Sequence, residues 1–164
     1  MRRKFCLLFI ILVFVSWQSF GQKIVMRIPG VTDKNEEIKT LSLDITAATS
    51  WTKGGGASVG KPNPGSLEIR KVNARSTSEL MKNITMGKAF SEITFEYQDE
   101  SGKAYYTITL TGAFPTQLAW VNPDCSDCLP KLEHRIAFVF QTIKVSDALN
   151  GTTVTWDVPA GKVH

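Results

Sequence analysis

Two stretches, Ile93-Thr-Phe-Glu-Tyr97 and Tyr106-Thr-Ile-Thr-Leu110, decide the fold class of this chain. In both, large apolar residues alternate with polar ones, and a period of two places alternate side chains on one face of a β-strand. The segment between them, Asp99 to Lys103, contains Gly102 and is typical of a hairpin loop. The two stretches are therefore predicted to pair as antiparallel strands with one apolar and one polar face.

The same alternation recurs along most of the chain. It appears in the segments 24–28, 41–46, 67–70 and 154–158. Ile136 to Phe140 differs because both of its faces are apolar, which predicts a central strand. Asn150-Gly151 predicts a further hairpin, since both residues tolerate positive φ. The chain is thus predicted to be a mainly-β, antiparallel barrel or sandwich.

One short helix is expected within this β protein, at about Thr77 to Met86. Ser76 and Glu79 fit the Ser-x-x-Glu capping box, in which each side chain satisfies a free amide at the start of a helix. Leu80 and Ile84 share one face, and Gly87 can end the helix in the left-handed conformation. We expect this helix to close one open end of the barrel or sandwich, and the Ser76–Glu79 pair to be structural.

The first 21 residues are typical of a secretory signal peptide. Arg2, Arg3 and Lys4 form a basic start, Phe5 to Val15 is a run of eleven apolar residues, and Ser19-Phe20-Gly21 predicts cleavage after Gly21. The alternative is an uncleaved anchor, but the run is shorter than the roughly 20 residues that span a bilayer. Residues 22–164 are expected to be a single exported domain, periplasmic or secreted, without a membrane span after cleavage.

Removal of the signal peptide nearly neutralises the protein. It takes away three of 19 basic residues and none of the 15 acidic ones, which leaves 16 against 15, or a net charge of +1. No basic patch remains that would favour nucleic-acid binding. The remaining 143 residues, 164 minus 21, can bury a sufficient core without cross-links.

A glycine- and proline-rich segment, Thr52 to Ser66, is predicted to be a long mobile loop. It contains Gly54-Gly55-Gly56 and Pro62-Asn-Pro-Gly65, and neither helices nor interior strands tolerate that density of Gly and Pro. Gly55 to Lys61 also approximates a nucleotide-binding P-loop, but Pro62 stands where Ser or Thr is needed and no helix can begin there. Backbone flexibility explains the segment better than nucleotide binding.

Cys125-Ser-Asp-Cys128 has three interpretations. A local disulfide is favoured by export, because disulfides persist outside the cytoplasm. A redox site requires a helix after the first cysteine, and Leu129-Pro130 prevents one. A zinc site requires two more ligands, and only His134 and His164 are available.

No set of residues in the sequence meets the requirements of catalysis. His134 directly precedes an apolar strand and is interpreted as a strand-edge residue rather than a general base. There is no nucleophile elbow and no telling pair of carboxylates. We expect no enzymatic activity, no cofactor and no metal.

The order of these elements resembles the haemolysin-coregulated protein family, Hcp, from about Lys23 to Val163. Ile28-Pro-Gly30, the strand with Leu41-Ser42, the glycine-containing loop, Leu67 to Val72 and the helix ending at Gly87-Lys88 follow one another as in the family. The most specific part is Val154-Thr-Trp-Asp-Val158, which is similar to the closing strand of the family. No piece is diagnostic alone.

The resemblance implies a compact two-sheet antiparallel β-barrel with one short helix, and six-membered rings that stack into a tube. A contractile sheath propels such a tube, and spike and effector proteins are the partners that the family implies. The loop after the second strand helps one ring grip the next, a role that would fall here on Trp51, Lys53, Gly54, Gly55, Gly56 and Lys61. Residues 1–21 and the cysteine pair depart from the family, whose tube proteins normally lack a signal peptide.

Two further hypotheses compete with the ring- or tube-forming protein. A secreted or periplasmic binding module would keep the barrel and stay monomeric, using the glycine-rich loop and Pro115 to Pro130 as contact surfaces. An exported dithiol redox protein would depend on Cys125 and Cys128.

Overall fold

The computed structural model describes residues 22–32, 35–51, 57–72, 76–121 and 133–164. The predicted signal peptide and the Cys125–Cys128 pair lie outside these residues. The described strands are β1 (Lys23–Arg27), β2 (Glu36–Ile38), β3 (Thr40–Ser42), β4 (Ile45–Thr46), β5 (Thr49–Trp51), β6 (Ala57–Val59), β7 (Asn63–Pro64), β8 (Leu67–Val72), β9 (Phe90–Gln98), β10 (Ala104–Val121), β11 (Glu133–Val139), β12 (Thr142–Asp147), β13 (Thr152–Asp157) and β14 (Lys162–Val163), and the helix is α2 (Thr77–Met86).

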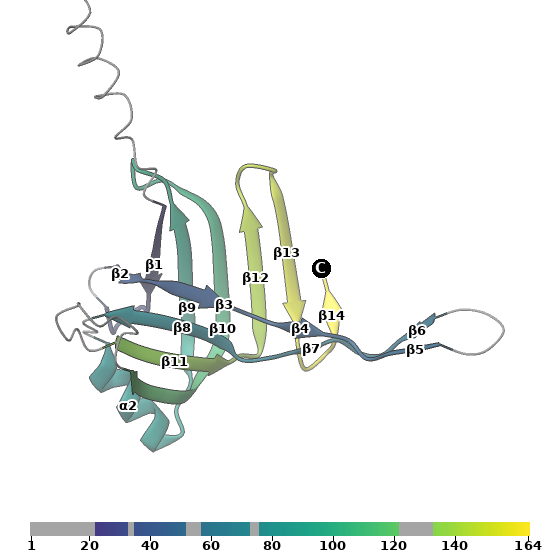
Figure 1. The fold of residues 1–164 in the computed structure, drawn as a ribbon, viewed down its shortest axis with the longest axis horizontal. Helices are drawn as coiled ribbons and strands as arrows, with labels where there is room; N and C mark the ends of the chain where they lie inside the picture. The colour runs from purple at the N-terminus through teal and green to yellow at the C-terminus, as the bar shows by residue number, and fades with distance from the viewer. Residues whose placement is uncertain (1–21, 33–34, 52–56, 73–75, 122–132) are drawn as a thin grey trace, which may run out of the picture.

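Two antiparallel layers share the strand β10. Its first part pairs with β9 and β12, and the first layer runs in the order β2, β1, β9, β10, β12, β13 and β14. Its second part pairs with β11, and the second layer continues through β8 to β3. Figure 1 shows β10 running down one layer and turning into the other. The mainly-β, two-sheet prediction is confirmed.

A glycine stands where β10 leaves the first layer. Gly112 has a φ of +61°, which side chains other than glycine adopt with strain, and a Cβ there would lie 2.7 Å from Gln141 Oε1. The pairing register then shifts between Pro115 and Gln117. Such an irregularity bends a strand and lets one strand serve two sheets.

The core lies between the two layers. Both facing surfaces contribute fully buried side chains, including Met26, Phe95 and Leu110 from the first layer and Ile69 and Phe138 from the second. Strand β11 is buried on both faces, which confirms the predicted central strand. The two predicted hairpins are also present, with Gly102 and Gly151 at φ of +81° and +65°.

The helix has the predicted bounds but not the predicted start. Gly87 ends it at a φ of +62°, and the amides of Gly87 and Lys88 donate to the carbonyls of Ile84 and Asn83, which is a Schellman motif. The predicted capping box was wrong, because the Ser76 side chain makes no hydrogen bond that caps the helix. Glu79 instead lies 3.6 Å from Lys82 in a partly exposed ion pair.

A buried charged cluster explains why Ser76 does not cap the helix. The Glu36 carboxylate on β2 accepts hydrogen bonds from the Ser76 amide (2.8 Å), the Ser76 hydroxyl (2.7 Å) and Lys71 Nζ (2.6 Å). Lys71 Nζ also donates to the Ser76 hydroxyl. Lys71 is only 1% exposed and Ser76 is fully buried. A carboxylate from a distant strand therefore takes the place of the local cap at the positive end of the helix dipole.

The cluster sets the ionisation of its members. Burial alone would raise the pKa of Glu36, but the hydrogen bonds from Lys71 and Ser76 outweigh it and hold the pKa below its ordinary value. Burial lowers the pKa of Lys71, and the contacts with Glu36 oppose that shift only in part. Because the two charges satisfy one another, removal of either partner leaves the other buried and unpaired.

The replacement Glu36→Ala is expected to destabilise the fold by about 3 kcal/mol, since Lys71 then keeps a buried charge without a partner. Urea unfolding followed by circular dichroism measures the change. The matched control is Glu37→Ala on the same strand, where the ion pair with Lys23 is 3.3 Å long and both side chains are at least half exposed. The control is expected to cost under about 1 kcal/mol. Equal losses in the two variants would contradict the structural role of the cluster.

Candidate assembly surfaces

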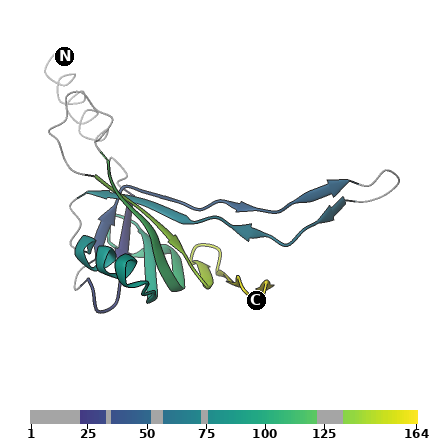
Figure 2. The same ribbon diagram turned by 90° about the horizontal axis from the view of Figure 1, so that it is seen from below.

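The most prominent surface feature is a long two-stranded arm that leaves the barrel between β3 and β8. The pairing of β3 with β8 continues through β4 with β7 and ends in β5 with β6. Two further backbone hydrogen bonds, from Gly65 N to Asp44 O (2.8 Å) and from Gly60 N to Ala48 O (2.7 Å), connect these ladders. Figure 2 shows the arm extending far beyond the two layers.

The prediction of a mobile loop over Thr52–Ser66 was therefore wrong for the described part, 57–66, which forms paired strands. Glycine suits these positions because the opposite strand approaches closely: a Cβ on Gly60 or Gly65 would lie 3.3 Å or 3.2 Å from a carbonyl oxygen across the arm, which is a tight contact. Pro64 is tolerated because a two-stranded ribbon leaves every second amide facing outward. Density of Gly and Pro excludes an interior strand, but not an isolated ribbon.

The residues predicted to mediate ring stacking are only partly described. Trp51 is the last residue of β5, and Lys61 lies on the return path between β6 and β7. Lys53, Gly54, Gly55 and Gly56 fall outside the described residues. The position of Trp51 and Lys61 on a protruding arm is compatible with the predicted role.

Lys61 links the arm to the C-terminal turn of the barrel. Its Nζ donates to the carbonyl of Pro159 at 3.3 Å. The side chain packs over Gly161, where a Cβ would lie 2.8 Å from Lys61 Cε. This contact joins residues far apart in sequence and defines where the arm crosses the last strands.

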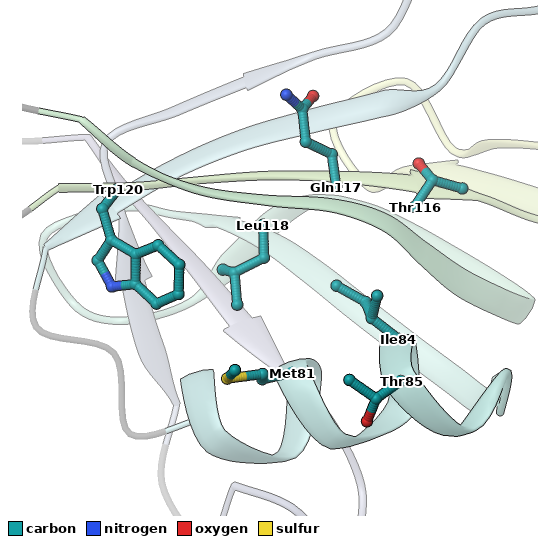
Figure 3. Close-up of a pocket in the computed structure, with 7 residues that line it drawn as sticks. All are labelled: Met81, Ile84, Thr85, Thr116, Gln117, Leu118 and Trp120. Carbon is teal, nitrogen blue, oxygen red and sulfur yellow. The ribbon is translucent and has the colours of Figure 1, made fainter.

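A second surface is an apolar groove between α2 and the second part of β10. It has a volume of about 380 Å³ and is lined by Met81, Ile84, Thr85, Thr116, Gln117, Leu118 and Trp120. Figure 3 shows Leu118 and Trp120 pointing from β10 toward the helix, with Met81 and Ile84 facing them, while Gln117 points away. Met81 and Trp120 are each about half exposed, at 51% and 52%. The groove is thus an apolar surface open to solvent.

Apolar side chains are also exposed on the C-terminal strands and the turn before β13. Leu149, Val154 and Val163, on the last three strands and their turn, are 77%, 49% and 64% exposed. Figures 1 and 2 both place α2 at one end of the barrel and β13 and β14 at the other. The groove therefore lies toward one end of the barrel, and the strands and turn that carry these three exposed side chains, named here the C-terminal patch, lie toward the other.

A third apolar feature lies between the layers at the base of the arm. This cleft of about 350 Å³ is lined by Leu41, Leu43, Ile45, Tyr97, Tyr106, Ile108, Ile143, Val145, Val154 and Trp156. Tyr97 and Tyr106 meet edge to face with ring centroids 5.7 Å apart. Neither the cleft nor the groove can be predicted from local sequence patterns, because each is formed by elements distant in sequence.

His134 occupies a different position from the one expected. It lies within β11, is 6% exposed, and its Nδ1 is 3.0 Å from Thr77 Oγ1 at the start of α2. The strand-edge interpretation was wrong, because β11 is flanked by β8 and β10. Among the described residues, no group of three potential metal ligands occurs, and no helix is long and apolar enough to cross a membrane.

The fold defines a class of protein, the two-layer antiparallel β-barrels with one short helix. The sequence pattern of the family described as "Type VI secretion system effector, Hcp" matches residues 30–146. The chain belongs to the Hcp family of type VI secretion, a family of structural secretion proteins rather than enzymes. The comparison with curated proteins gives no significant match.

Solved structures share this fold at low sequence identity. Hcp1 from Salmonella typhimurium superimposes with a TM-score of 0.70 and 16% identity, over 87% of this chain and 99% of that chain. A structure titled "Structure of a type six secretion system protein" gives a TM-score of 0.73 with 14% identity, over 88% and 100%. A chain of the anti-feeding prophage baseplate, 6-fold symmetrised, gives 0.55 with 13% identity, over 79% and 95%.

The contact of Lys61 with Gly161 can be tested with a matched pair of glycine variants. Gly161→Ala and Gly151→Ala both place alanine at positive φ, +64° and +65°, and each is expected to cost about 1 kcal/mol. Only the first also displaces Lys61, since nothing lies within 4 Å of a Cβ at Gly151. Hydrogen exchange of β4 to β7 is expected to accelerate in Gly161→Ala and not in Gly151→Ala. Equal exchange of the arm in both would show that Lys61 does not hold it.

Proposed function

We propose that this protein is a non-enzymatic structural component that assembles into six-membered rings, which stack through the arm. The arm is the observation that carries the proposal: it leaves the barrel as a ribbon whose pairing within one subunit is limited to its own two strands. A projecting ribbon is suited to contact a neighbouring subunit, where ordering costs are offset by new contacts. The six-fold symmetry of the baseplate that contains a related fold supports the same ring size.

The two apolar ends support a head-to-tail arrangement within each ring. A closed ring of identical subunits needs two different surfaces that face each other across every interface. The groove beside α2 lies toward one end of the barrel, and β13 and β14, next to the exposed apolar residues Leu149, Val154 and Val163, lie toward the other. Large aromatic and Met side chains at a groove are typical of interface centres.

Export is the second part of the proposal. The basic start, the apolar run and the small residues before Gln22 favour cleavage after Gly21, and the resulting protein would act in the periplasm or outside the cell. Cys125 and Cys128 would then form a local disulfide. The intact mass of the exported protein tests both ideas, because cleavage and oxidation each change it by a known amount. Sheath, spike and effector proteins remain the expected partners of the assembly.

A monomeric binding module is the competing function, and the apolar cleft at Tyr97 and Tyr106 favours it. A volume of about 350 Å³ with a mainly apolar lining is within the range of small-ligand sites. That function requires a monomer with a free cleft. Solution mass therefore separates the two accounts.

Light scattering after size exclusion of residues 22–164, which include all described residues, is expected to give six times the monomer mass. Deletion within residues 53–61 is expected to leave single rings but abolish longer stacks, because the end of the arm is lost. Electron microscopy distinguishes rings from stacks. A clean monomer at every concentration would overturn tube formation by this protein alone and favour the binding module.

Replacement of Trp120 by Ser is expected to weaken ring formation at least tenfold in midpoint concentration, since a half-exposed aromatic residue at an interface centre contributes more than about 1.4 kcal/mol. The control is Val139→Ser on neighbouring β11, a 45% exposed apolar residue that lies outside both surfaces. Equal effects of the two variants, or none from Trp120→Ser in a protein that forms rings, would exclude the groove as a ring interface.

A further inference from the structure

A buried histidine lies where the two walls of the groove meet the barrel. His134 on β11 is opposite Trp120 of β10 on one side and opposite Lys71 of β8 on the other. Its ring centroid is 6.2 Å from that of Trp120, and its Nδ1 is 3.0 Å from the hydroxyl of Thr77, the first residue of α2. The same imidazole therefore contacts the strand wall and the start of the helix wall.

The charges around His134 are unfavourable for a second positive charge. Lys71 on β8 is buried and held as a cation by Glu36 on β2, and both act electrostatically on the ring. Thr77 on α2 and Trp120 on β10 are uncharged. On β11 itself, Glu133 is paired with Lys39, and Arg135 with Glu68 at 3.1 Å. Among the described residues, no carboxylate is bonded directly to the imidazole.

Protonation would restrict the hydrogen bond with Thr77 and place a second positive charge in this buried site. A neutral imidazole can accept a hydrogen bond from Thr77 or donate one to it, whereas the imidazolium can only donate. The charged ring would also have to remain 94% buried beside the ammonium of Lys71, in a position that water reaches poorly. Burial and the charge of Lys71 lower the pKa of His134, against the weaker attraction of Glu36.

We propose that His134 is an acid-sensitive joint that fixes α2 to the barrel when neutral and releases the helix, and with it the groove between α2 and Trp120, when protonated. The occupant of the groove does not matter for this proposal, because the joint acts within one subunit. It is therefore independent of ring formation.

The direction of the pH effect follows from the lowered pKa. Unfolded histidine takes up its proton near pH 6.5, while folded His134 resists protonation until a lower pH. The unfolded state thus binds more protons in that window, and stability is full above about pH 7 and falls as the pH decreases through 6.5 and below. Loss of the Glu36 contacts adds a second fall only in the range of a glutamate, below about pH 4.5.

The first test is a titration of the folded protein. The chain contains two histidines, so two imidazole signals are expected in a proton–carbon NMR spectrum, and His164→Gln assigns them. The His134 signal is expected to titrate below pH 6.5, together with a change in the indole signal of Trp120. A midpoint at or above pH 6.5 would overturn the proposal without any variant at the site.

The second test follows the helix itself. Hydrogen exchange of the α2 amides, corrected for the intrinsic effect of pH, is expected to lose about tenfold in protection between pH 7 and 5 for each unit by which the pKa is lowered. His134→Gln, which keeps a neutral polar side chain, is expected to remove that loss, while His164→Gln keeps it. If His134→Gln does not fold, Thr77→Val, which removes only the hydroxyl, is expected to reduce α2 protection at pH 7. An unchanged acid loss in folded His134→Gln would refute the joint.

Discussion

Strand β10 belongs to both layers, and its pairing with β9, β12 and β11 joins the two layers to each other. A single backbone can pair in two sheets only if it turns between them, and the turn falls at Gly112, where φ is +61° and the side chain of Gln141 fills the space a Cβ would need. Pairing with β12 ends at Thr111, pairing with β9 ends at Ala113, and pairing with β11 begins at Phe114. The groove with α2 lies on the later part, so the same turn that closes the core also places Trp120 above the helix.

Several of the buried polar side chains, among them Glu36, Lys71, Ser76 and His134, lie at the start of α2 for a physical reason. Strands β2, β8 and β11 meet the start of α2 there, and a helix start leaves amides that need acceptors. Glu36 supplies the acceptor, Lys71 balances its charge, and Ser76 bridges them. His134 lies beside this pair, and the charge of Lys71 lowers its pKa while that of Glu36 raises it. The start of α2 is consequently held by the buried charges of Glu36 and Lys71.

The arm differs in construction from the groove and the C-terminal patch. The arm is built from paired backbone, which gives it length and direction. The groove and the C-terminal patch use apolar side chains on rigid strands and a helix. The groove and the exposed C-terminal side chains lie on different elements, which is the arrangement that the proposed head-to-tail ring requires.

The sequence by itself determined the fold class, the existence of a central strand at Ile136 to Val139, the hairpins at Gly102 and Gly151 and the helix from Thr77 to Met86. These features depend on local periodicity and turn chemistry, which single stretches of sequence contain. Tertiary structure alone decided that Ser76 binds Glu36 and Lys71 instead of capping its helix, that residues 57–66 pair as an arm, and that His134 meets Trp120 and Thr77. Each of these requires a partner from a distant segment, and the strength of a buried charge or a cross-strand pair depends on surroundings that no local pattern specifies.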